Sequence, residues 1–174
     1  MIEKKYVGDI EFAEGKVDIT DPGYDADIWC RINDVNVKPG IYKAYAEFDD
    51  EERRVRVAYV EHIDYSDSIE ESDYNESIGC IGVDAGLAGF FASPKKDYSD
   101  DEWSKLCDWM FDYSEEHNPE NVLEGDAYFK DGGFFTSSGY GDGGYEVFAV
   151  RKNDEIVALE IVFIDDEMWS DDDE

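Results

Sequence analysis

Short segments of alternating apolar and polar residues, separated by turn-forming residues, constrain the fold of this chain more than any other feature. Residues 41–48 alternate in this way after a Lys38-Pro39-Gly40 turn, and residues 53–63 return after a charged turn at 49–52. Such alternation is typical of β-strands with one buried face, and Pro and Gly mark the turns between strands. The two segments therefore predict a β-hairpin. The apolar side chains expected on one face of its second strand are Val55, Val57 and Tyr59.

The same pattern predicts three further hairpins and two more strands. The hairpins are expected over residues 6–20 with a turn at Glu14-Gly15, over 127–135 with a turn at 131–133, and over 145–164 with a turn at 152–155. Residues 78–83 predict a buried strand, and residues 87–91 predict a short strand or bulge. Residues 64–76 carry six acidic residues and no basic one, so we expect a mobile loop there.

One segment has the periodicity of a helix. Ser99 and Glu102 form the S-x-x-E pattern of a capping box, in which each side chain accepts a backbone amide hydrogen bond at the helix start. Apolar residues follow at helical spacing, and Asn118-Pro119 is expected to end the helix. We expect this apolar stripe to pack on a sheet. It consists of Trp103, Leu106, Cys107, Met110 and Phe111.

Strands outnumber the helix and short turns join them, which predicts a mainly β (α+β) fold. We expect an antiparallel sandwich or half-open barrel with one helix packed on the sheet. A length of 174 residues indicates one domain. We place a single β-rich domain at 1–164 and an acidic C-terminal tail at 165–174. Trp29, Trp103 and Trp109 are expected in the core, and Trp169 in the acidic tail could anchor a partner.

The charge balance is extreme, with 46 acidic against 15 basic residues and a formal net charge of −31. Such a field repels nucleic acid and anionic membranes, so we expect direct binding to neither. A basic protein partner, a bound cation, simple solubility or a halophilic origin would each explain the charge. Disorder is not expected, because 12 Tyr, 10 Phe and 4 Trp lie within patterned segments.

The cysteines and the N-terminal sequence indicate the compartment. Cys30, Cys80 and Cys107 have no C-x-x-C spacing, so neither structural zinc nor a disulfide framework is expected. Reduced thiols are typical of the cytoplasm. We expect no signal peptide, because Met1-Ile2-Glu3-Lys4-Lys5 leads directly into polar sequence, and no apolar run approaches the roughly 18 residues of a membrane span. We therefore expect a cytoplasmic protein, with its oligomeric state left open.

A glycine-rich segment, Ser137-Ser138-Gly139-Tyr140-Gly141-Asp142-Gly143-Gly144-Tyr145, makes a tight turn with a carboxylate at its tip and then enters a strand. Three weaker segments accompany it: Gly15-Lys16 with Asp21-Pro22-x-Tyr24, Val83-Asp84-Ala85-Gly86 with Gly89-Phe90-Phe91, and Trp103 with Cys107-Asp108. Their order and spacing, over nearly the whole chain, resemble the domain of unknown function 4241 family of bacterial and phage proteins. The resemblance implies a compact domain and brings no established activity. Gly23 stands where we expect relatives often to carry Cys, so any role of that cysteine is absent here.

Three aspartates form the candidate site. Asp21, Asp84 and Asp142 each follow or end an apolar strand and adjoin Gly or Pro. Clustered, their carboxylates could bind Ca²⁺ or Mg²⁺ or hold a water as general base. The alternative is that each caps its own turn through side-chain hydrogen bonds to the backbone. No organic cofactor is expected, and the sequence identifies no catalytic residue. Gly141 or Gly143 is expected at positive φ.

These observations favour an acidic, non-enzymatic interaction protein that binds a basic protein partner by charge complementarity. Its size and charge suit an inhibitor of a nucleic-acid-handling enzyme, of the immunity or anti-defence type. The alternative is a divalent-cation-binding module or metal-dependent hydrolase that uses Asp21, Asp84 and Asp142.

Overall fold

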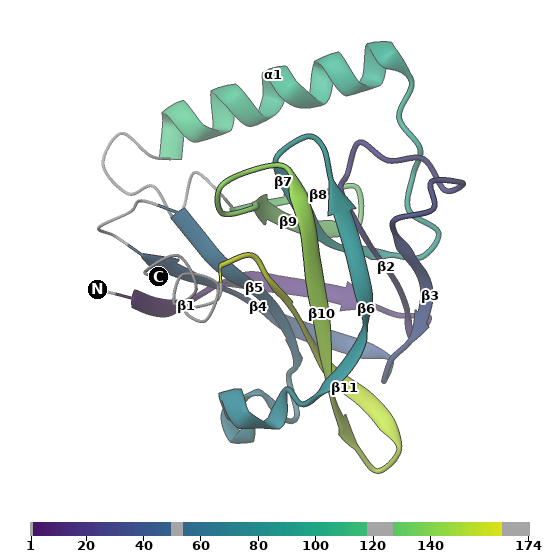
Figure 1. Cartoon of the computed structure of the whole chain (residues 1–174), viewed down its shortest axis with the longest axis vertical. Helices are drawn as coiled ribbons and strands as arrows, with labels where there is room; N and C mark the ends of the chain where they lie inside the picture. Colours follow the sequence, from purple (N-terminus) through teal and green to yellow (C-terminus); the bar gives the residue numbers. More distant parts are fainter. Residues whose placement is uncertain (1, 50–53, 118–126, 165–174) are drawn as a thin grey trace, which may run out of the picture.

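A computed structural model describes residues 2–49, 54–117 and 127–164. It has two antiparallel β-sheets and one α-helix, arranged as a sandwich with the helix on the outside (Figure 1). This confirms the predicted fold class, and the sheets do not close into a barrel. Residues 50–52 of the expected turn, the Asn118-Pro119 helix end and the 165–174 tail with Trp169 lie outside the described residues.

The larger sheet has six strands and the smaller sheet has five. The larger runs in the order β1 (Ile2–Phe12), β4 (Gly40–Asp49), β5 (Arg54–His62), β11 (Glu155–Val162), β10 (Gly143–Lys152) and β6 (Glu76–Val83). The smaller runs in the order β3 (Ile32–Asn36), β2 (Lys16–Thr20), β7 (Leu87–Ala92), β9 (Gly133–Ser137) and β8 (Ala127–Lys130). All neighbouring strands are antiparallel.

The main core fills the space between the two sheets. Phe12 and Tyr42 from the larger sheet and Phe90 and Phe134 from the smaller sheet belong to one buried cluster, and none is more than 1% exposed. Burying one such side chain stabilises a fold by about 1.5–3 kcal/mol. Strand alternation places the neighbours Phe91 and Phe135 on the opposite, outer face of the smaller sheet.

The helix α1 (Asp100–His117) packs on that outer face. The capping box forms as predicted: the Ser99 N–H donates to Glu102 Oε1 at 3.1 Å, and the Glu102 N–H donates to Ser99 Oγ at 3.2 Å. The predicted stripe is only partly correct, because Cys107 is exposed and Phe111 is 64% exposed. The face of the helix that meets the small sheet is rotated from the predicted stripe, towards Trp109 and Tyr113 and away from Cys107 and Phe111. The residues that do face it are Trp103, Leu106, Trp109, Met110 and Tyr113.

The predicted hairpins have different outcomes. The hairpins β4–β5, β8–β9 and β10–β11 are confirmed. The hairpin over residues 6–20 is wrong, because β1 and β2 lie in different sheets (Figure 1). The turn itself is present, with the Gly15 N–H donating to the Phe12 carbonyl at 3.0 Å. Gly15 has φ of +66°, and a Cβ there would lie 2.7 Å from the Val37 carbonyl oxygen. The chain therefore crosses between sheets at this glycine instead of folding back.

The acidic segment 64–76 packs on the larger sheet, which differs from the mobile loop that the sequence predicted. It contains two short 3-10 turns, η1 (Ser66–Ser68) and η2 (Glu71–Asp73), and its Tyr74 is 7% exposed. Tyr74 packs with Tyr59 and Val57 on the outer face of the larger sheet. Both faces of β5 are consequently buried. The three side chains expected on one face are divided between them: a register shift opposite Glu47 and Phe48 places Val55 in the main core, whereas Val57 and Tyr59 lie on the outer face.

The prediction for β6 is corrected in part, and that for β7 is confirmed in one of its two alternatives. The strand predicted over 78–83 is an edge strand in which Ile81 and Val83 are buried and Cys80 is exposed. The segment 87–91 forms a regular strand, with Ala88, Phe90 and Phe91 buried. Within the described part of the chain, no helix combines the length and apolarity that crossing a membrane requires.

Candidate functional site

Asp21 is fully buried where the chain leaves β2. Its Oδ1 accepts the Gly23 N–H at 2.7 Å, and its Oδ2 accepts the Asp84 and Ala85 N–H groups at 2.8 and 2.7 Å. The carboxylate thus ties the loop after β2 to the turn between β6 and β7. Asp21 does meet Asp84, as the sequence grouping predicted, but through the Asp84 backbone. The Asp84 side chain is exposed.

Asp142 lies elsewhere, exposed in the turn that joins β9 to β10. Ser138 Oγ and the Tyr145 hydroxyl both donate to the Gly141 carbonyl, at 2.9 and 2.6 Å, and hold this turn. Gly141 has φ of +110°, as predicted. Across residues 2–49, 54–117 and 127–164, no three His, Cys, Asp or Glu side chains are grouped in a way that could hold a metal ion. Of the three aspartates, Asp21 caps its own turn through the Gly23 N–H, whereas the side chains of Asp84 and Asp142 accept no hydrogen bond from a described residue.

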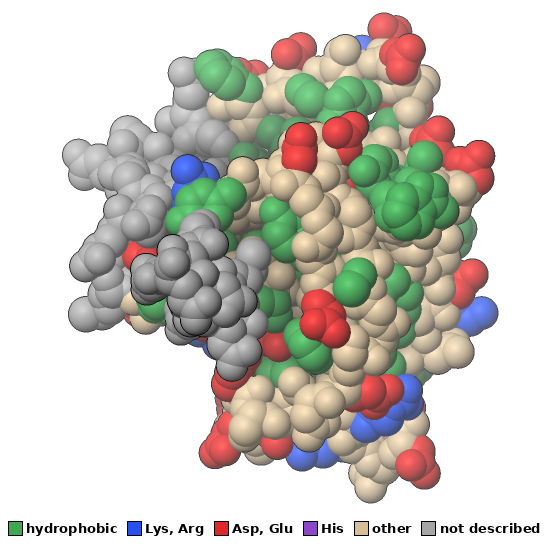
Figure 2. All heavy atoms as spheres, in the orientation of Figure 1, with side chains coloured by type: hydrophobic (Ala, Val, Ile, Leu, Met, Phe, Trp, Pro, Cys, Tyr) green, Lys and Arg blue, Asp and Glu red, His purple; other side chains and the backbone are tan. Residues whose placement is uncertain are grey.

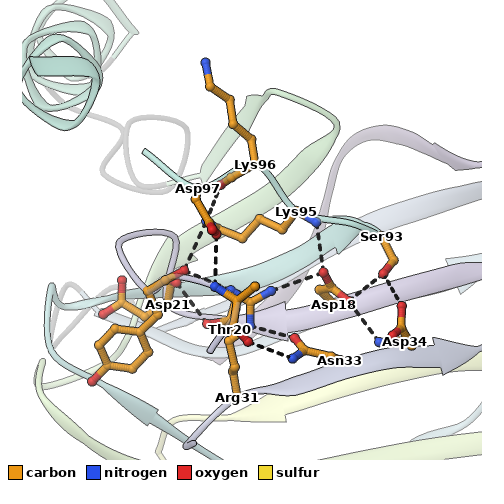
Figure 3. Close-up of polar contacts among 12 residues, drawn as sticks. Asp18, Thr20, Asp21, Arg31, Asn33, Asp34, Ser93, Lys95, Lys96 and Asp97 are labelled. Carbon is orange, nitrogen blue, oxygen red and sulfur yellow. Dashed lines mark hydrogen bonds and ion pairs between the residues drawn. The ribbon is translucent and has the colours of Figure 1, made fainter. Parts of the chain in front are cut away.

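A buried polar network extends from the same loop (Figure 3). Asp18, 3% exposed, accepts four hydrogen bonds: from the Asp34 N–H, Ser93 Oγ, the Lys95 N–H and Arg31 Nη2. Burial raises the pKa of Asp18, but these hydrogen bonds and the Arg31 charge outweigh it and hold the pKa below its usual value. The network joins β2, β3 and the 93–97 segment, and its role is structural.

Lys95, like Arg31, is a buried cation beside this loop, and it is 5% exposed. Its Nζ donates to the carbonyls of Lys96 at 2.7 Å and Tyr24 at 3.3 Å, and it lies 4.9 Å from the Tyr98 ring centre. Burial, with a smaller effect of the nearby Arg31 charge, lowers the pKa of Lys95 to about 8. Lys95 is thus committed to holding the Tyr24 backbone.

A hollow of about 260 Å³ lies over this network, between the loop after β2, the β6–β7 turn and the first turn of α1. We call it the acid–aromatic pocket. Its lining residues are Asp21, Gly23, Tyr24, Asp25, Asp84, Ala85, Tyr98, Asp100 and Trp103.

The pocket combines unpaired negative charge with aromatic rings. The carboxylates of Asp25, Asp84 and Asp100 make no hydrogen bond or ion pair with any described residue. The Tyr98 and Trp103 rings lie 6.1 Å apart, tilted by 50°. Burial, and then the neighbouring Cys30 thiol, raise the pKa of Tyr24 to about 12, with smaller effects from the Asp21 and Asp84 charges. A positively charged group is the complement of such walls.

Trp29 lies in the same loop as Tyr24 and Asp25 and is 91% exposed. This corrects the prediction that Trp29 belongs to the core. Asp25 and Asp27 beside it are also exposed. Figure 2 shows acidic side chains bordering hydrophobic ones at the upper right, on the side where the loop between β2 and β3 lies in Figure 1. An exposed tryptophan surrounded by carboxylates is typical of a binding surface.

A second hollow, of about 350 Å³, lies on the other side of Tyr98 and has a different charge. Three lysines line it, Lys96, Lys105 and Lys130, together with Glu102 and Asp131. Lys96 pairs with Glu102 at 2.7 Å, and Lys130 Nζ lies 4.7 Å from the Trp109 ring. Its charges are therefore partly balanced within the protein.

A cluster of glutamates is buried under the 65–74 segment. Lys4 Nζ contacts Glu61 Oε2 at 2.9 Å, and the Tyr59 hydroxyl lies 3.0 Å from Glu71 Oε2. Glu160, 3% exposed, has an Oε2 without a hydrogen-bond partner among the described residues. Burial, and then the neighbouring Glu71, raise the pKa of Glu160 to about 9. This carboxyl is protonated at neutral pH.

The chain matches no protein-family model, no curated protein and no solved structure. The resemblance to the domain of unknown function 4241 family therefore stays a prediction, and the site is interpreted from its geometry alone.

The pocket contains two of the three predicted aspartates, Asp21 and Asp84. Sequence reasoning missed Asp25 and Asp100. The sequence analysis also placed Trp29 in the core. The available indication against this was Asp25 and Asp27, which precede it within four positions, because aspartate is seldom fully buried.

Proposed function

We propose that this chain is an acidic, non-catalytic interaction protein of the cytoplasm that binds a basic protein partner. The observation that carries the proposal is the unpaired acidic and aromatic surface around the acid–aromatic pocket and Trp29. Interfaces depend on a few exposed aromatic side chains for affinity, and complementary charge increases the association rate.

The whole-chain charge supports the same conclusion. A net charge of −31 disfavours nucleic acid and favours a basic surface, such as that of a nucleic-acid-handling enzyme. An inhibitor that covers the nucleic-acid-binding face of such an enzyme fits these properties. The three-aspartate cation site is not proposed, because Asp21 is occupied by amides and Asp142 lies apart.

The test is affinity capture from a lysate at low and high salt, followed by competition with duplex DNA. We expect basic proteins that high salt releases and that duplex DNA displaces. Trp29→Ala should reduce the capture, while Phe111→Ala, which removes an exposed aromatic ring from the helix, serves as the matched control. Failure to capture a salt-sensitive basic protein, or equal capture by Trp29→Ala and the parent chain, would contradict the proposal.

A further inference from the structure

We infer that the acid–aromatic pocket receives an arginine side chain of the basic partner. The inference rests on the proposed function and adds the chemical group that the site recognises. It combines three independent properties of the pocket: its unpaired carboxylates, its aromatic walls and its open rim.

No described cation forms an ion pair with the exposed carboxylates of the pocket, and the Lys95 charge acts on Asp25 and Asp21 only at longer range. Asp25, Asp84 and Asp100 approach the hollow from three separate segments, and none has an ion-pair partner among the described residues. The two nearby cations are committed elsewhere. Arg31 donates to Asp18 at 3.1 Å and to the Tyr24 carbonyl at 2.9 Å, and Lys95 donates to two carbonyls.

The aromatic walls select the type of cation. Tyr24, Tyr98 and Trp103 present ring surface to the same hollow. A guanidinium stacks on aromatic rings, is more weakly hydrated than an ammonium, and spreads its donors over a plane. It can therefore lie against Trp103 while donating to carboxylates on different sides, which the compact ammonium of lysine does less well.

Gly23 keeps the rim of the pocket open. A Cβ at this position would lie 3.1 Å from Trp103 Cη2 and 3.3 Å from Asp21 Oδ1, both tighter than ordinary contacts. A side chain here would extend from the lining of the hollow and press on the indole. The residue that the family resemblance singled out as unusual is thus the one whose lack of a side chain leaves the indole edge uncovered.

The test uses Nα-acetyl-arginine amide as the probe and the full chain as the receptor. We expect saturable chemical-shift changes at the Trp103 indole N–H and at the Tyr24 and Ala85 amides in ¹H–¹⁵N spectra. The uncharged citrulline analogue should produce none, and the lysine analogue weaker ones. Asp100→Asn should weaken the affinity about fivefold, the value of one exposed charge interaction. Asp101→Asn is the matched control, because Asp101 lies in the same helical turn but does not line the pocket.

Asp84→Asn provides a second variant if Asp100→Asn disturbs the helix start, since the Asp84 side chain makes no hydrogen bond in the described structure. Equal weakening by Asp100→Asn and Asp101→Asn, or equal shifts with the citrulline analogue, would overturn the inference. If a basic protein is captured equally by Asp100→Asn and Asp101→Asn, the pocket inference fails while the proposed function stands. If the arginine probe binds selectively but no basic protein is captured, guanidinium recognition stands and the proposed function fails.

Discussion

At the scale of single residues, Asp21 shows how one carboxylate joins two loops. Its two oxygens accept three backbone amides from segments about sixty positions apart, which no single turn could satisfy. Asparagine would retain only one acceptor oxygen, so at least one buried amide would lose its partner. We predict that Asp21→Asn lowers the free energy of unfolding by about 1–3 kcal/mol. Urea denaturation is the measurement, and Asp84→Asn, a change at an exposed side chain, should stay within about 0.5 kcal/mol of the parent.

Glu160 makes stability depend on pH in the opposite direction to most carboxylates. Its folded-state pKa of about 9 lies above its ordinary value, so the unfolded chain releases the proton first. The contribution of Glu160 to stability is therefore complete below about pH 4.5 and is lost as the pH rises towards 9. Glutamine keeps the shape and cannot ionise. We predict that Glu160→Gln gains stability relative to the parent as pH rises from 5 to about 9, measured by urea unfolding.

The control for this prediction is Glu11→Gln, at an exposed position of β1. It should shift the stability by the same small amount at both pH values. A difference between Glu160→Gln and the parent that does not change with pH would contradict a raised pKa. The charged side chains of the cluster around Glu160, which the Glu160→Gln variant retains, are Lys4, Glu47, Arg56, Glu61 and Glu71.

At the scale of elements, local chemistry was predictable and pairing across the molecule was not. The turns at Asp131-Gly132 and Asn153-Asp154 have positive φ at both residues, which is the geometry of tight hairpins, and both hairpins were predicted. The partner of β1 was not predictable, because alternation fixes which face of a strand is buried but not which sheet it joins. The pocket was missed for the same reason: a loop, a turn and a helix start build it, and no sequence period relates them.

The helix provides a prediction at this scale. Leu106 is 3% exposed and packs with Phe91 and Phe135, whereas its neighbour Cys107 is exposed. Leu106→Ala should reduce the free energy of unfolding by about 2–5 kcal/mol, because the removed methyl groups leave a cavity between helix and sheet. Cys107→Ala, which lies on the predicted stripe but outside the observed contact, should stay within about 0.5 kcal/mol. Thermal or urea denaturation of the two variants decides between the predicted and observed stripes.

At the scale of the whole molecule, the acid-rich segment 166–174 provides a test of electrostatic steering. The last strand, β11, ends at Val162, and the Ile164 N–H still donates to the Arg56 carbonyl at 3.0 Å, so a truncation after Asp165 keeps the buried end of the sheet. The deletion removes six acidic residues. Distant charges act on diffusional encounter and are screened over about 10 Å at 0.1 M salt, while close contacts determine dissociation. We predict that the truncated chain binds immobilised poly-arginine with a slower association rate, an unchanged dissociation rate and a weaker dependence on salt. Its thermal unfolding should match that of the full chain, which serves as the control for folding. An unchanged association rate would show that these residues do not steer the partner, and a faster dissociation rate would show that they contact it directly.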